Sequence, residues 1–132
     1  IGEVKKSYRQ AQIALEIGRV FEREKNIIFY EKLGLGRLIY QISPELCEKF
    51  LSEIVSIAVL DEIEKEFYNT IHCFFENGLN ISETSRKLFV HRNTLVYRLD
   101  KIKKMTGLDI RDFEQAIVFK VAMMVRERII YG

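Results

Sequence analysis

Two helix-length segments separated by three residues constrain the fold of residues 80–106 more than any other feature of this sequence. The stretch reads NISETSRKLFVHRNTLVYRLDKIKKMT. Ser82 is the expected cap of a first helix that ends near Leu88, and a second helix is expected over residues 92–106. The segment between them, residues 89–91, is too short for anything except a tight turn. The sequence therefore predicts a helix-turn-helix.

The second of these helices has an apolar face and a polar face. Leu95, Leu99, Ile102 and Thr106 recur at i, i+4, i+7 and i+11, which places them on one side to pack against the preceding helices. The opposite side is left for a partner. Arginine can bind guanine with two hydrogen bonds, asparagine can pair with adenine, and the N–H groups at a helix N-terminus favour phosphate. The residues expected to contact DNA are Ser82, Thr84, His91, Arg92, Asn93, Thr94, Tyr97, Arg98 and Lys101.

Charge is distributed unevenly along the chain, although the net charge is only +2. Residues 1–81 contain 10 Lys+Arg against 13 Asp+Glu, a difference of −3, whereas residues 82–132 contain 11 against 6, a difference of +5. Within the second part, residues 82–104 alone hold seven cations against two acids. A basic patch beside an acidic scaffold is typical of nucleic-acid binding, although a solvated helix face gives the same composition.

The remainder of the chain is predicted to be mostly helical. One proline and seven glycines in 132 residues suit helices better than a strand-rich fold. Gly107 is expected to end the 92–106 helix, and Asp112 with Gln115 forms a capping box for the last one. Outside the helix-turn-helix, the expected helices cover residues 7–24, 35–42, 43–56 (with Ser43 as cap before Pro44), 61–75 and 113–128.

One short β-strand is expected over Asn26–Glu31, a run of β-favouring residues that precedes a Gly34-Leu35-Gly36 break. The sequence contains no second convincing strand to pair with it. Its N–H and C=O groups need a ladder partner, which is either a missing upstream segment or the same strand in a second copy, and without one residues 27–30 are expected to fray. A homodimer is therefore expected, with the last helix as the alternative interface.

Other classes of function find little support in the sequence. His72-Cys73 and Cys47 lack the spacing of a metal site, and no cofactor or metal is expected. The acids near Asp61 suit an exposed helix face better than a catalytic pair, so an enzyme is not expected. Apolar stretches are far shorter than the roughly 20 residues needed to cross a bilayer, which predicts a soluble protein without membrane contact. Cys47 and Cys73 follow no secretory signal and are expected to be reduced thiols, which predicts a cytoplasmic protein. The main alternative is a helical protein-interaction module that makes no direct DNA contact.

Residues 88–99, which read LFVHRNTLVYRL, closely resemble the C-terminal helix-turn-helix domain of the PucR/CdaR family, the purine-catabolism and sugar-diacid regulators. Lys101-Ile102 and the TGLD of residues 106–109 extend this resemblance, which covers about residues 61–124. A weaker similarity over residues 7–35 points to the end of the GGDEF-like middle domain of those regulators. The resemblance implies a bacterial transcription regulator whose terminal helix-turn-helix reads double-stranded operator DNA.

The same resemblance predicts how the chain is divided. Residues 1–42 are expected to be the remnant of the middle domain with a linker, and residues 43–132 the DNA-binding domain. The chain begins at Ile1 rather than at methionine, so we expect it to have been cut from a longer protein. In such regulators the effector is sensed upstream, which implies an N-terminal sensor domain as a further partner.

Overall fold

The computed structural model describes residues 2–21 and 34–131, and every regular element in these two ranges is a helix. This confirms the prediction of a mostly helical fold. The strand predicted over residues 26–31 lies outside the described residues. In chain order the helices are α1 (Gly2–Phe21), α2 (Leu35–Tyr40), α3 (Pro44–Ile54), α4 (Ile57–Asp61), α5 (Lys65–Glu76), α6 (Ile81–Leu88), α7 (Arg92–Thr106) and α8 (Phe113–Tyr131).

The chain forms two compact units, which are described separately below. The first unit comprises Ile1–Glu53 with Val121–Gly132, and the second comprises Ile54–Lys120. Helix α8 contributes residues to both. The predicted division into a domain remnant and a DNA-binding domain after residue 42 stays a prediction, because these units describe packing and not the ancestry of the segments.

In the first unit, α2 packs on α1, and α3 begins as the sequence predicts. The Ser43 hydroxyl accepts a hydrogen bond from the Leu46 amide at 3.3 Å, which caps α3 ahead of Pro44. Arg128 of α8 connects back to the end of α2. Its Nη2 donates to the Tyr40 carbonyl at 3.3 Å, and its guanidinium carbon lies 5.0 Å from the centre of the Tyr40 ring.

Several helix boundaries differ from those predicted. The segment predicted as one helix over 61–75 contains the end of α4, a turn and then α5, because Ser56 starts a new helix by accepting a hydrogen bond from the Val59 amide at 3.2 Å. The first helix begins at Gly2, before the expected Ser7 cap, and the last continues to Tyr131. Residues that can cap a helix and residues that favour helix often lie at neighbouring positions, so the sequence locates a helix boundary only to within a few residues.

The core of the second unit is formed by α4 to α7 and the first part of α8. Phe75 and Phe119 meet edge to face, with ring centres 6.4 Å apart and planes at 71°. Each fully buried large side chain stabilises the fold by about 1.5–3 kcal/mol relative to exposure. The most deeply buried of these are Leu60, Ile71, Phe74, Leu95, Leu99, Ile102, Ile110 and Phe119.

None of the helices in the described ranges is both long enough and apolar enough to span a lipid bilayer.

Candidate nucleic-acid interface

Helix α6 is capped by Asn80, which corrects the prediction that Ser82 is the cap. The Asn80 Oδ1 atom accepts a hydrogen bond from the Glu83 amide at 2.8 Å, so the helix begins at Ile81. Ser82 is exposed, and its hydroxyl instead accepts a hydrogen bond from Arg92 Nη1 at 3.3 Å. Ser82 therefore joins the start of α6 to the start of α7 and stays on the accessible surface.

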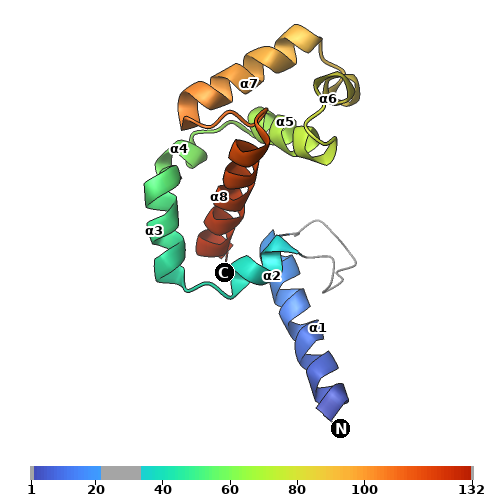
Figure 1. Ribbon diagram of the computed structural model, residues 1–132, viewed down its shortest axis with the longest axis vertical. Helices are drawn as coiled ribbons and strands as arrows, with labels where there is room; N and C mark the ends of the chain where they lie inside the picture. The colour runs from blue at the N-terminus through green and yellow to red at the C-terminus, as the bar shows by residue number, and fades with distance from the viewer. Residues whose placement is uncertain (1, 22–33, 132) are drawn as a thin grey trace. The chain divides into compact units, whose positions relative to one another are not determined.

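A short turn of three residues, 89–91, connects α6 to α7. Figure 1 shows the two helices in succession. The Val90 amide donates to the Ser85 carbonyl at 3.1 Å and the Phe89 amide donates to the Arg86 carbonyl at 3.2 Å, the pairing of a Schellman motif. That motif requires a left-handed residue, and Phe89 has φ 55°. His91 then caps α7, because its Nδ1 accepts a hydrogen bond from the Asn93 amide at 3.2 Å. The helix-turn-helix predicted from the sequence is confirmed.

The predicted apolar face of α7 is buried. Leu95, Leu99 and Ile102 are all fully inaccessible to solvent, and α7 packs on α4, α5 and α6. The small residues Thr84 and Ser85 are buried on α6, which lets α6 approach its neighbours closely. This packing fixes the rotation of α7 about its own axis and therefore decides which of its side chains remain available.

The opposite side of α7 is accessible and polar. Tyr97 is 61% exposed, and Lys101 lies with its Nζ atom 5.2 Å from the centre of the Phe67 ring of α5. The accessible predicted residues come from the start of α6, the turn and one side of α7. We define them together as the α7 surface: Ser82, His91, Arg92, Asn93, Thr94, Tyr97 and Lys101.

Two residues predicted to contact DNA do not lie on this surface. Thr84 is fully buried, and its hydroxyl donates to the Asn80 carbonyl at 2.7 Å. The Arg98 side chain is only 14% exposed and is turned toward α5, where it forms an ion pair with Glu66 and donates to Thr70 Oγ1 at 3.1 Å. Thr84 is therefore a packing residue, and Arg98 joins α7 to α5.

Three residues beside the α7 surface were not singled out as DNA contacts. Arg86 and Lys87 are exposed in the last turn of α6, and the Phe89 side chain is 95% exposed. Arg86 Nη2 donates a hydrogen bond to Glu83 Oε2 at 2.5 Å. This hydrogen bond and the positive charge of Arg86 lower the pKa of the Glu83 carboxyl. The concentration of cations in residues 82–104 was the signal for Arg86 and Lys87, and the signal for Phe89 was its place in the predicted turn over residues 89–91.

The C-terminal end of α7 is held by an ionic network. Gly107, with φ 78°, ends the helix, and Arg111 then pairs with both Asp100 of α7 and Asp109, each at 2.8 Å. The hydrogen bond from Arg111 is the main cause that holds the pKa of Asp109 below its ordinary value of 3.8. The predicted capping box is half formed: Asp112 caps the Gln115 amide at 3.1 Å, but the Gln115 side chain accepts from the Asp109 amide.

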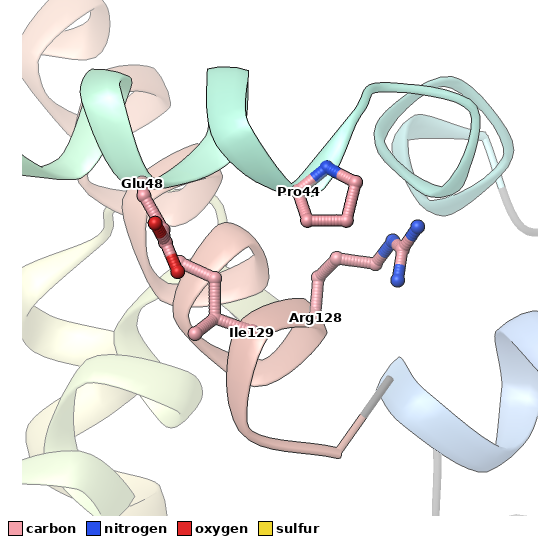
Figure 2. Close-up of a pocket in the computed structure, with 4 residues that line it drawn as sticks. All are labelled: Pro44, Glu48, Arg128 and Ile129. Carbon is pink, nitrogen blue, oxygen red and sulfur yellow. The ribbon is translucent and has the colours of Figure 1, made fainter.

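The first unit contains a small cavity, which is the alternative to the α7 surface as a binding site. It has a volume of about 130 Å³ and is lined by Pro44 and Glu48 of α3 and by Arg128 and Ile129 of α8 (Figure 2). Cavities that bind drug-sized ligands are about 300–1,000 Å³. This cavity is too small for such a ligand, so it does not rival the α7 surface as a candidate site.

Within residues 2–21 and 34–131, no group of three or more His, Cys, Asp or Glu side chains is arranged to hold a metal ion. Cys47 and Cys73 are free thiols.

Comparison with known families and proteins supports the helix-turn-helix. Residues 67–125 match the family described as the PucR C-terminal helix-turn-helix domain. This range begins in α5 and ends in α8, so it contains all of α6 and α7.

Two proteins that are similar to this chain over most of its length are named as regulators. The carbohydrate diacid regulator of Escherichia coli (strain K12) is 29% identical over 126 residues, which cover 96% of this chain and 33% of that protein. The purine catabolism regulatory protein of Bacillus subtilis (strain 168) is 27% identical over 128 residues, which cover 96% of this chain and 24% of that protein. The chain thus spans between a quarter and a third of the length of these curated relatives.

A solved structure shares the fold. The regulator of polyketide synthase expression from Bifidobacterium adolescentis superposes with a TM-score of 0.54, and the match covers 89% of this chain and 48% of that one. The two chains are 22% identical in the aligned region.

Proposed function

We propose that this chain, whose residues 67–125 match the PucR C-terminal helix-turn-helix domain family, binds duplex DNA by placing α7 in the major groove. The observation that carries this proposal is the α7 surface. Its polar and cationic side chains surround the N-terminal end of a helix whose opposite face is fully buried. A helix in the major groove presents the side chains of its first turns to the base edges.

The exposed residues of the α7 surface are assigned different roles. Arg92 and Asn93, in the first turn of α7, are the residues suited to read base edges through paired hydrogen bonds. Lys101 and the cations at the end of α6 are suited to phosphate, which fixes the protein on the duplex without reading sequence. Ser82, His91, Thr94 and Tyr97 complete the contact surface.

Salt dependence tests the proposal. Neutralising several phosphates releases counterions, so affinity for a duplex falls steeply between about 50 and 200 mM salt. Duplexes selected from a random pool by the 132-residue chain supply the ligand. Lys101→Ala should reduce the slope of log affinity against log salt by about 1. Lys120→Ala, an exposed lysine of α8 in the same unit, is the matched control and should leave the slope unchanged.

Base reading is tested by a second pair of variants. Asn93→Ala should lower discrimination between selected and random duplexes by about 1–3 kcal/mol with no loss of thermal stability. Asn69→Ala, an exposed asparagine on α5, is its control. Binding that does not respond to salt, together with unchanged discrimination, would favour the alternative of a protein-interaction module without DNA contact.

The remaining proposals concern the longer protein. Because the named relatives are three to four times the length of this chain and are described as regulators, we infer that an upstream sensor domain controls this one. The regulator acts in the cytoplasm, where its DNA lies, and it binds as a homodimer. One helix-turn-helix reads only a few base pairs, whereas a two-fold pair reads a palindrome with half-sites about 34 Å apart.

A further inference from the structure

Phe89 combines two unfavourable features in the turn between α6 and α7. Its backbone is left-handed, with φ 55°, a region that side chains with a Cβ atom rarely adopt. Its side chain is 95% exposed, so a large apolar ring lies almost entirely in water. Strained residues of this kind concentrate at functional sites, where a second requirement maintains them.

Other left-handed positions in the chain show how unusual this combination is. Gly107 ends α7 with φ 78° and has no side chain to strain. Leu79 has φ 62°, but its side chain is half-buried and gains packing in return. In the part of the chain that the structure describes, Phe89 is the left-handed residue that is neither glycine nor packed. Folding alone would be served better by glycine at this position.

The surroundings of Phe89 indicate the partner. Exposed Lys87 precedes it, and exposed His91 and Arg92 follow it at the N-terminal end of α7. Phe89 therefore lies in the chain between the cations Lys87 and Arg92, next to residues of the α7 surface. A partner that satisfies both features carries dense negative charge and apolar carbon atoms within a few ångströms of it. The edge of a DNA groove offers phosphates, deoxyribose carbons and thymine methyl groups in this arrangement.

We propose that Phe89 contacts DNA directly and packs its ring on apolar atoms at the groove edge when α7 occupies the major groove. This inference rests on the proposed function and extends it by adding an apolar contact to the polar α7 surface. The contact removes the ring from water only in the complex, so it contributes to affinity without releasing counterions.

Fluorescence provides the first test, because the chain contains no tryptophan. Phe89→Trp places a single indole at the turn, and its emission should shift or be quenched when the selected duplex is added to the 132-residue chain. Tyr8→Trp is the matched control, since Tyr8 is an aromatic residue of α1 that is 66% exposed and lies outside the α7 surface. Emission from position 89 that stays constant at saturating duplex overturns the proposal.

Replacement by glycine provides the second test. Phe89→Gly relieves the left-handed strain and should raise the thermal midpoint by roughly 2–6 °C. It should nevertheless weaken duplex binding by about fivefold to tenfold with the salt slope unchanged, because the lost contact is apolar. Higher stability shows that weaker binding does not come from a damaged fold. Unchanged affinity, or a loss that appears only as a lower salt slope, overturns the proposal.

Substituted duplexes identify the contacted atoms. Replacing thymine by uracil removes the methyl groups, and an affinity loss for wild type but not for Phe89→Gly assigns the ring to them. If Phe89→Gly lowers the affinity equally for the thymine and the uracil duplex, the ring contacts deoxyribose carbons.

The wild-type titration in the same experiment separates the two proposals. If the wild-type chain binds the duplex with steep salt dependence and Phe89→Gly binds equally well, the proposed function stands and the role of Phe89 falls. If wild type does not bind, both fall. A ring that instead holds two copies together is recognised when Phe89→Gly lowers the mass of the protein without DNA, and that result also overturns the DNA contact.

Discussion

Single residues at the helix ends decide where the DNA-facing surface begins. Asn80 and Ser82 are both residue types that cap helices, and they lie two positions apart. Only the Asn80 side chain accepts a hydrogen bond from a free amide of α6, at 2.8 Å. The hydroxyl of Ser82 is left to Arg92, at 3.3 Å. The first residue therefore stabilises the fold and the second orients a candidate DNA contact.

Substitution of these two residues should separate the two roles. Asn80→Ala removes the partner of the Glu83 amide and should lower the free energy of unfolding by about 0.5–2 kcal/mol. Ser82→Ala should change it by less than about 0.5 kcal/mol, as expected for an exposed position that is not a cap. Urea denaturation of both variants measures the difference. Equal losses, or a larger loss at Ser82, would restore Ser82 as the cap.

At the scale of elements, α7 is held at its middle and in its C-terminal half by polar interactions, and along its length by apolar packing. Arg98 connects its middle to α5 through Glu66 and Thr70, and Arg111 connects its C-terminal half to the loop before α8 through Asp100 and Asp109. Leu95, Leu99 and Ile102 are buried on the side of α7 that packs against α4, α5 and α6. A helix held in this way keeps a fixed rotation, and sequence-specific reading depends on such a fixed orientation.

Arg98 is therefore expected to act on stability more than on DNA binding. Arg98→Lys keeps the positive charge but cannot reach both Glu66 and Thr70 in the same way, and it should lower the free energy of unfolding by about 1–2 kcal/mol. The salt slope of duplex binding should stay unchanged. Arg98→Ala should be at least as unstable, again with a smaller change in slope than Lys101→Ala. A variant of native stability and reduced slope would place Arg98 on the DNA, as the sequence predicted.

The Asp109–Arg111 pair should make the free energy of unfolding depend on pH in the acidic range. Arg111 lowers the pKa of folded Asp109 below its ordinary value of 3.8, so the carboxylate binds protons more readily in the unfolded chain. The stabilisation is therefore complete above that value and is lost as the pH falls through the lower, folded pKa. Between about pH 5 and pH 2, wild type should lose unfolding free energy more steeply than Asp109→Asn. Parallel curves in acid denaturation would show that the pair contributes no pH dependence.

The elements differ in how far the sequence could predict them, and the reason is the range of the interactions involved. The buried face of α7 was predicted correctly because the 3.6-residue period of Leu95, Leu99 and Ile102 is local. The role of Arg98 depends on Glu66, which is 32 residues away in the chain. The position of Arg98 on the flank of α7 can be predicted from the sequence, but the residue with which its side chain pairs cannot. Thr84 was misplaced for the same reason, since its burial follows from the packing of α6.

At the scale of the whole molecule, acidic and basic residues are concentrated in different segments of the chain. Within the second unit, residues 54–78, which contain α4 and α5, carry five acids against one cation, whereas residues 82–104 of α6 and α7 carry seven cations against two acids. DNA would be attracted to the second group and repelled by the first. The charge therefore favours one orientation of approach, with the α7 surface toward the duplex.

An exposed apolar pair of residues on α8 predicts how two copies of the protein assemble. Phe113 is 70% exposed and Ile117 is 43% exposed, and residues four apart lie on the same side of a helix. We expect this face to pair with its counterpart in a second copy, because two helix-turn-helices bind a palindrome far more tightly than one. Light scattering at high micromolar concentration should give twice the mass of the chain, and a strictly monomeric chain would contradict the dimer.

Two substitutions distinguish this interface from the strand predicted over residues 26–31. Replacing both Phe113 and Ile117 by serine removes apolar surface that is already exposed in the monomer, so it should dissociate the dimer without unfolding either copy. Ile28→Pro removes a backbone donor from any ladder in that segment and should leave an α8 dimer intact. If Ile28→Pro instead dissociates the dimer while the double serine variant stays dimeric, the copies are joined through the 26–31 segment, and the exposed pair on α8 must have another partner.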